Sequence, residues 1–100
     1  MIRVLTVDDH ALLREGIAAL VNAETDMKLV ADACNGRDAI EKLRLHRPDV
    51  TLMDLQMPTL NGMRAIIGIR SEFPNARIIA LTTYTGDVQV LVTTLPTTTL

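Results

Sequence analysis

Short apolar runs alternate along the chain with segments in which apolar residues recur every three or four positions. The runs predict buried β-strands, because they are rich in branched side chains and bounded by aspartate, asparagine, glycine or proline. They cover residues 2–7, 27–33, 49–54 and 77–82. The segments between them predict three amphipathic helices. We expect these residues to form the apolar helix faces: Leu13, Ile17, Leu20 and Val21; Ala39, Ile40 and Leu43; Met63, Ile66 and Ile67.

This alternation of strands and helices predicts an α/β fold. Apolar strands that are connected through helices form parallel sheets with helices on both faces. The end of the chain departs from the pattern, because residues 88–100 carry no charge and five of the final eight residues are threonine. Threonine and Pro96 disfavour a helix there. The alternation of Val88, Val90 and Val92 fits a strand at least as well.

Composition limits the classes of function. The 100 residues, 48% of them hydrophobic, suffice for one small domain with a core. The formal net charge is -2, and the ten basic residues are dispersed among 12 acidic ones, which argues against a nucleic-acid-binding surface. The single cysteine, Cys34, excludes an intrachain disulfide. No stretch approaches the ~20 apolar residues of a membrane span. We therefore expect a cytoplasmic protein without a signal peptide.

Carboxylates follow two of the predicted strands. Asp8 and Asp9 come directly after the first strand, and Asp54 ends the third. Ligands of open parallel sheets bind beyond the carboxyl ends of the strands, so these side chains converge if the two strands are neighbours. Such a cluster favours Mg²⁺, and a carboxylate can also form an aspartyl-phosphate. Each feature alone has an ordinary explanation as well, since aspartates often begin helices or occupy turns.

Taken together, the motifs resemble those of a response-regulator receiver domain of the NarL/FixJ type, the type with a LuxR-type output domain. They are VDDH at 7–10, LMDLQMP at 52–58, NG at 61–62 and LTTY at 81–84. The resemblance covers a receiver domain at residues 1–91 and leaves an atypical threonine-rich tail at residues 92–100. It implies a flavodoxin-like (CheY-like), doubly wound parallel sheet with strand order 2-1-3-4. The fifth strand and fifth helix of the family are expected to be missing or replaced.

The resemblance also implies roles for individual residues. Asp54 is expected to be the phosphoacceptor for a sensor histidine kinase, and Thr82 the switch hydroxyl that moves to meet the phosphoryl group. The expected ligands of Mg²⁺ are Asp8, Asp9, Asp54 and the backbone carbonyl of Gln56. A DNA-binding output domain is expected in full-length relatives. This chain itself is expected to bind no nucleic acid and no membrane.

The sequence departs from the family at its C-terminal end. The family has a lysine after its fifth strand, but the only lysines here are Lys28, in or beside the second strand, and Lys42, on the second helix. We therefore expect an intact acidic pocket with impaired switching. Loss of the fifth strand is expected to leave the fourth strand at an open edge. Two chains could then exchange their C-terminal segments and form a homodimer, which we favour over the alternative of a monomer with a disordered tail after about residue 91.

Two other functions stay open at this point. A truncated receiver could act as a dimerising interaction module with a vestigial pocket. A small phosphohydrolase with an aspartate nucleophile is less well supported, because Asp54-Leu55-Gln56 lacks the second acid of that class. Beyond self-phosphorylation of Asp54 from a phosphodonor, we expect no enzymatic activity.

Overall fold

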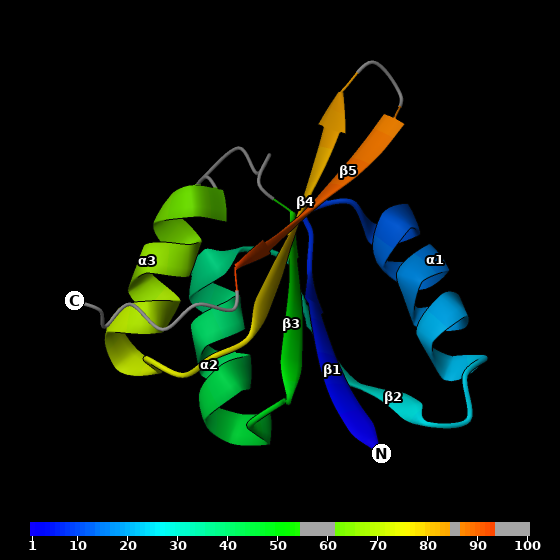
Figure 1. Cartoon of the computed structure of the whole chain (residues 1–100), viewed down its shortest axis with the longest axis horizontal. Helices are drawn as coiled ribbons and strands as arrows, with labels where there is room; N and C mark the ends of the chain where they lie inside the picture. The colour runs from blue at the N-terminus through cyan, green and yellow to red at the C-terminus, as the bar shows by residue number, and fades with distance from the viewer. Residues whose placement is uncertain (55–61, 85–86, 94–100) are drawn as a thin grey trace.

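The structure, a computed structural model, describes residues 1–54, 62–84 and 87–93. Its elements are β1 (Ile2–Val7), α1 (Ala11–Asn22), β2 (Met27–Ala33), α2 (Gly36–His46), β3 (Val50–Asp54), α3 (Gly62–Glu72), β4 (Ile78–Tyr84) and β5 (Asp87–Thr93). The strands form one sheet in the order β2-β1-β3-β4-β5 (Figure 1). The first four strands run parallel, as the resemblance predicts. In the described ranges, no helix is long and apolar enough to cross a membrane.

The main core lies between the sheet and the two helices α2 and α3, which cover the same face (Figure 1). Strands and helices both contribute side chains that are at most 6% exposed: Leu5, Val7, Met53, Ile78 and Ala80 from the strands, and Ala39, Leu43, Ala65, Ile66 and Ile69 from the helices. Burying a large aliphatic side chain stabilises a fold by about 1.5–3 kcal/mol. This layer therefore holds β1 and β3 side by side and fixes the edge at which they end.

The apolar face of α3 differs from the prediction. Ile66 and Ile69 are 6% and 0% exposed, whereas Ile67 is 66% exposed. Successive helix residues are rotated by about 100°, so Ile66 and Ile67 do not face the sheet together. Met63, predicted on the same face, has a side chain outside the described part of the structure. The predicted face of α2 is confirmed, because Ala39 and Leu43 are buried and Ile40 packs against the core.

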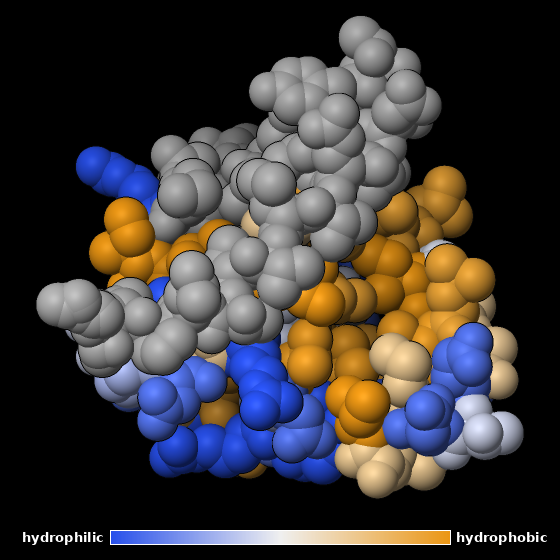
Figure 2. Space-filling model, viewed as in Figure 1, coloured by the Kyte–Doolittle hydropathy of each residue, from blue (hydrophilic) through white to orange (hydrophobic). Residues whose placement is uncertain are grey.

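The opposite face of the sheet carries α1, the only one of the described helices on that side (Figure 1). Val21 is the one buried residue of α1, while Leu13 and Leu20 are 41% and 72% exposed. The expectation that these leucines form a covered apolar face is therefore wrong. The reason is that α1 has no neighbouring helix among the described residues, so only its side against the sheet is covered. Figure 2 shows the resulting apolar surface over α1 and the adjacent strands.

The C-terminal segment forms a strand in its own chain. β5 pairs antiparallel with β4, from Ile78 opposite Thr93 to Tyr84 opposite Asp87. The open edge predicted for the fourth strand is therefore wrong. Two residues connect β4 to β5, and so short a connection gives an antiparallel hairpin, whereas a parallel pair needs a crossover of about a dozen residues or more. The fifth strand of the described sheet is thus antiparallel, and residues 94–100 of the predicted tail lie outside the described residues.

Candidate functional site

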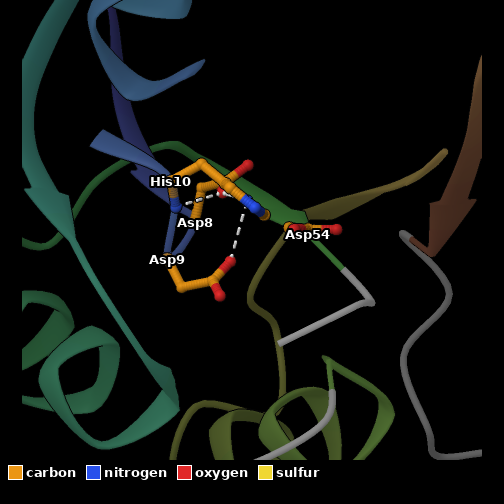
Figure 3. A group of neighbouring side chains, drawn as sticks. All are labelled: Asp8, Asp9, His10 and Asp54. Carbon is orange, nitrogen blue, oxygen red and sulfur yellow. Dashed lines mark hydrogen bonds and ion pairs between the residues drawn. The ribbon is translucent and has the colours of Figure 1, made fainter. Parts of the chain in front are cut away.

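An acidic cluster lies at the carboxyl ends of β1 and β3. These strands are parallel neighbours, so the residues that end or follow them emerge at the same edge of the sheet. Asp8 and Asp9 follow β1, and Asp54 is the last residue of β3. One oxygen from each carboxylate and one ring nitrogen of His10 all lie within 4.8 Å of one another (Figure 3). The structure therefore brings together the three aspartates that the sequence placed in one pocket.

The cluster has a buried floor and a more accessible rim. Asp8 and Asp54 form the floor and are 1% and 6% exposed. The side chains of Asp9 and His10 form the rim and are 25% and 68% exposed. A buried carboxylate is costly unless it is paired or hydrogen-bonded. Asp8 meets this requirement, because its Oδ1 accepts a hydrogen bond of 2.8 Å from the backbone N–H of His10.

His10 is the member of the cluster that the sequence reasoning did not predict. Its Nδ1 lies 3.1 Å from Oδ1 of Asp8 and 3.0 Å from Oδ1 of Asp9. The hydrogen bond with Asp8, followed by the negative charges of Asp9 and Asp8, raises the pKa of His10 above its usual value. A signal for this was present, since His10 directly follows two acidic residues at a strand end.

Arg14 brings a second cationic side chain close to the cluster. It lies one turn into α1, and its Nη1 donates a hydrogen bond of 2.6 Å to the backbone carbonyl of Asp8. The guanidinium therefore fixes the chain where it leaves β1. This residue was also not singled out from the sequence, because a lone arginine on a helix carries no positional signal.

The oxygens of the cluster fit a hard divalent cation. Oδ1 of Asp9 is buried and accepts no hydrogen bond, and its approach to Nδ1 of His10 is an electrostatic contact. A buried carboxylate oxygen without a hydrogen bond has a lone pair available for a metal. Mg²⁺ prefers oxygen ligands, often one or two carboxylates together with water. The donors of Asp8, Asp9 and Asp54 match this preference better than the imidazole of His10 does.

The structure places the other predicted site residues only in part. Thr82 lies in β4 opposite Gln89 of β5, one residue after Leu81, which is the register partner of Asp54. Its backbone therefore lies two residues before the carboxyl end of β4, beside the strand that ends in Asp54. The structure describes no more of Thr82 than this, and Gln56 lies outside the described residues.

The two lysines lie on β2 and α2. Lys28 is exposed on β2, the edge strand beside β1. Lys42 donates from Nζ to the backbone carbonyl of Asp32 at 3.2 Å and lies 3.6 Å from Oδ1 of Asp38. These are the positions expected from the sequence.

A doubly wound sheet with aspartates gathered at the carboxyl ends of β1 and β3 defines a receiver-type fold and site. The profile of the response regulator receiver domain matches residues 4–96. The response regulator protein VraR of Staphylococcus saprophyticus is 38% identical over 89 residues, which cover 89% of this chain and 43% of VraR. The uncharacterized transcriptional regulatory protein YxjL of Bacillus subtilis is 45% identical over 89 residues, covering 89% of this chain and 41% of YxjL. The chain therefore belongs to the response regulator receiver domain family.

Solved structures agree with this assignment. The response regulator domain of Thermotoga maritima CheB superposes with a TM-score of 0.79 at 40% identity, covering 85% of this chain and 63% of that one. A LuxR-family response regulator from Aurantimonas sp. SI85-9A1 superposes with a TM-score of 0.80 at 33% identity, covering 85% of this chain and 61% of that one. The predicted CheY-like fold and the NarL/LuxR-type relationship are confirmed. The chain spans less than half the length of the curated relatives it matches.

The family assignment defines the class of activity. The chain is a receiver domain of the two-component type. Such domains generally take up a phosphoryl group and bind Mg²⁺ in their acidic pocket, and they are signalling domains rather than enzymes.

Proposed function

We propose that this chain accepts a phosphoryl group on Asp54 from the phosphohistidine of a sensor histidine kinase. The observation that carries the proposal is the convergence of three carboxylates within 4.8 Å at one edge of the sheet, in a chain of the receiver family. Asp8, Asp9, Asp54 and the backbone carbonyl of Gln56 are the proposed ligands of Mg²⁺. When bound, the ion would neutralise charge on the phosphoryl oxygens during transfer.

Asp54 is the proposed nucleophile. An oxygen of its carboxylate attacks phosphorus, so that an O–P bond forms while the N–P bond of the phosphohistidine breaks, and the electron pair stays on the imidazole nitrogen. Asp54 is only 6% exposed, which limits the access of water to the acyl phosphate. The buried position at the end of β3 therefore supports transfer to Asp54 over hydrolysis at that site.

The two aspartates after β1 have different proposed roles toward Mg²⁺. We assign Asp9 as a direct ligand, because its buried Oδ1 accepts no hydrogen bond. Asp8 is assigned an indirect role through water, since its Oδ1 already accepts the backbone N–H of His10. Removal of Asp9 should accordingly weaken metal binding more than removal of Asp8.

Phosphorylation is proposed to produce a weak conformational signal. A ligand shifts a conformational equilibrium only by the difference in its interactions with the two states. We give neither lysine of residues 1–100 the role of the lysine that usually contacts the phosphoryl group, because Lys28 and Lys42 lie on β2 and α2. Thr82, in the C-terminal half of β4, is then the main group left to respond. Addition of beryllofluoride should change NMR shifts near the cluster only, and large changes spreading along residues 82–91 would contradict the weak signal.

Acetyl phosphate with Mg²⁺, followed by intact-mass measurement, tests the phosphoacceptor. We expect the wild-type chain to gain the mass of one phosphoryl group and Asp54→Asn to gain none. Asp26→Asn, at an exposed position before β2, is the matched control and should behave as wild type. Chelation of Mg²⁺ should prevent the gain. An undiminished gain in Asp54→Asn would refute the assignment, and no gain under any condition would favour the interaction module with a vestigial pocket.

The partners and location of the whole protein are proposals that rest on the relatives. YxjL is named a transcriptional regulatory protein and VraR a response regulator. We propose that the full-length protein carries a DNA-binding output domain and acts in the cytoplasm. The predicted exchange of C-terminal segments between two chains assumed an open β4 edge, which β5 fills. A dimer through this segment therefore requires a different geometry.

A further inference from the structure

We propose that two copies of this chain associate through β5, whose outer edge pairs antiparallel with β5 of the second copy across a two-fold axis. The two sheets would then continue into one another. Within the part of the chain that the structure describes, β5 ends the sheet, and no strand pairs with its outer edge. The inference is independent of phosphoryl transfer, because the edge strand is the fifth in the sheet and the acidic cluster is at the ends of β1 and β3.

Residues 87–93 lack the sequence and register features that usually protect a sheet edge. Natural edge strands are guarded by lysine and other charged residues, by proline, or by bulges that interrupt the ladder. Asp87–Thr93 contains no lysine, arginine or proline, and its single charge is at the first position. All seven residues pair one-to-one with β4, without a register shift. The backbone is therefore extended and regular, and its outer edge is suited to a further strand.

The other edge of the sheet, β2, is guarded. It exposes Lys28 and Asp32, and its pairing with β1 contains a register shift. Two of its backbone groups are bonded to side chains from helices: the N–H of Leu29 to Oδ1 of Asn22 and the carbonyl of Asp32 to Nζ of Lys42, both at 3.2 Å. A partner strand would have to displace these contacts. The contrast between the two edges favours association at β5.

The charge pattern of β5 favours a second copy in antiparallel orientation. All seven residues overlap only when Val90 of one copy faces Val90 of the other, which places Asp87 opposite Thr93. The two aspartates are then six residues apart, or about 20 Å, beyond the screening length of about 8–10 Å at ordinary salt. Parallel pairing would place the two aspartates side by side, where like charges destabilise a sheet. Antiparallel pairing is also the arrangement that a closed two-fold dimer requires.

Light scattering or analytical ultracentrifugation of the wild-type chain tests the association. We expect a concentration-dependent species of twice the chain mass of 11.0 kDa. Asp54→Asn should form the same species, because β4 separates Asp54 on β3 from β5. A monodisperse species of 11.0 kDa at high protein concentration would overturn the proposal.

Opposite charges at the centre of the strand test its geometry. Val90→Lys alone and Val90→Glu alone should each shift to the monomer mass, because like charges then face each other across the axis. An equimolar mixture should return to the dimer mass, since lysine faces glutamate. Lys28→Glu, on the guarded β2 edge, is the matched control and should remain dimeric. A dimer that persists in both Val90 variants, or folded variants that stay monomeric when mixed, would overturn the β5 interface.

A peptide keeps the proposal testable if the Val90 variants do not fold. A synthetic peptide with the sequence of residues 87–93 should compete for the β5 edge and convert the wild-type dimer into a monomer with bound peptide. A peptide of the same composition in scrambled order is the control. A dimer that is unaffected by an excess of the matching peptide would contradict pairing at this edge.

Discussion

Replacement of Asp9 by asparagine is expected to stabilise the chain in the absence of Mg²⁺ and to remove most of the stabilisation that Mg²⁺ provides. The substitution keeps the shape of the side chain and removes its charge. No hydrogen bond to the buried Oδ1 is lost, because that atom accepts none. The change therefore isolates the electrostatic part of the cluster.

The magnitude follows from the spacing of the carboxylates. Their oxygens lie within 4.8 Å of one another, and two unit charges at such a distance repel by about 3 kcal/mol at an effective dielectric constant near 20. Asp9 has such a repulsion with Asp8 and another with Asp54. Its side chain is 25% exposed, so solvent and salt screen part of this energy. We expect a net increase of about 1–2 kcal/mol in the free energy of unfolding without metal.

Mg²⁺ changes the difference in stability in the opposite direction, because it stabilises the wild-type chain more than the variant. A ligand that binds only the folded state at a free concentration of about ten times its Kd adds about 1.4 kcal/mol to the free energy of unfolding. The wild-type chain should gain this amount, and Asp9→Asn should gain little of it. Removal of Mg²⁺ with EDTA should therefore reverse the order of stability of the two proteins or widen the difference in favour of the variant.

Urea denaturation followed by circular dichroism, with EDTA or with Mg²⁺, measures both effects. The hydrogen bond with Asp8 and the charges of Asp9 and Asp8 raise the pKa of His10. An alkaline buffer is therefore required to keep the imidazole neutral, so that the comparison reports only the repulsion between the carboxylates. Glu24→Gln makes the same change in net charge at an exposed position after α1, and it should show neither effect. Lower stability of Asp9→Asn in EDTA, or an unchanged gain from Mg²⁺, would refute the reasoning.

Two further predictions concern the helices on the core face. Gly68→Ala should raise the free energy of unfolding by about 1 kcal/mol, because alanine is the better helix former. The added Cβ would lie 3.6 Å from Cδ1 of Ile40, which is an ordinary contact. A urea midpoint below that of wild type would show that this contact is too tight. Arg44 donates two hydrogen bonds of 2.6 Å to Glu72, and they lower the pKa of Glu72. The stabilisation that this pair gives the folded state is therefore present above the usual carboxyl pKa, and it is lost as the pH falls through the lowered pKa. Glu72→Gln should therefore have a lower urea midpoint than wild type at neutral pH and the same midpoint in acid. A constant difference in urea midpoint across this range would contradict the pairing.

The acidic cluster could be predicted from the sequence because it depends on backbone topology. Parallel strands end at the same edge, so Asp8 and Asp54 meet once β1 and β3 are neighbours. The contribution of His10 depends on the direction of one side chain at the start of α1, which the residue pattern does not specify. The exposure of Leu20 on α1 was missed for a different reason. Helical periodicity shows which residues share a face, but the extent of their burial depends on the elements that pack against it.

The β4–β5 hairpin shows how the expected family topology obscured a local signal. The alternation of Val88, Val90 and Val92 indicates a strand, and only residues 85–86, one of them a glycine, separate it from β4. A two-residue connection with glycine between two strand patterns is typical of a hairpin. The expectation of an open β4 edge followed from the absence of the family's parallel fifth strand, although an antiparallel strand satisfies the same backbone groups. Among the described residues, the strand at this edge of the sheet is thereby β5 and not β4, and association through the C-terminal segment no longer requires two chains to exchange strands.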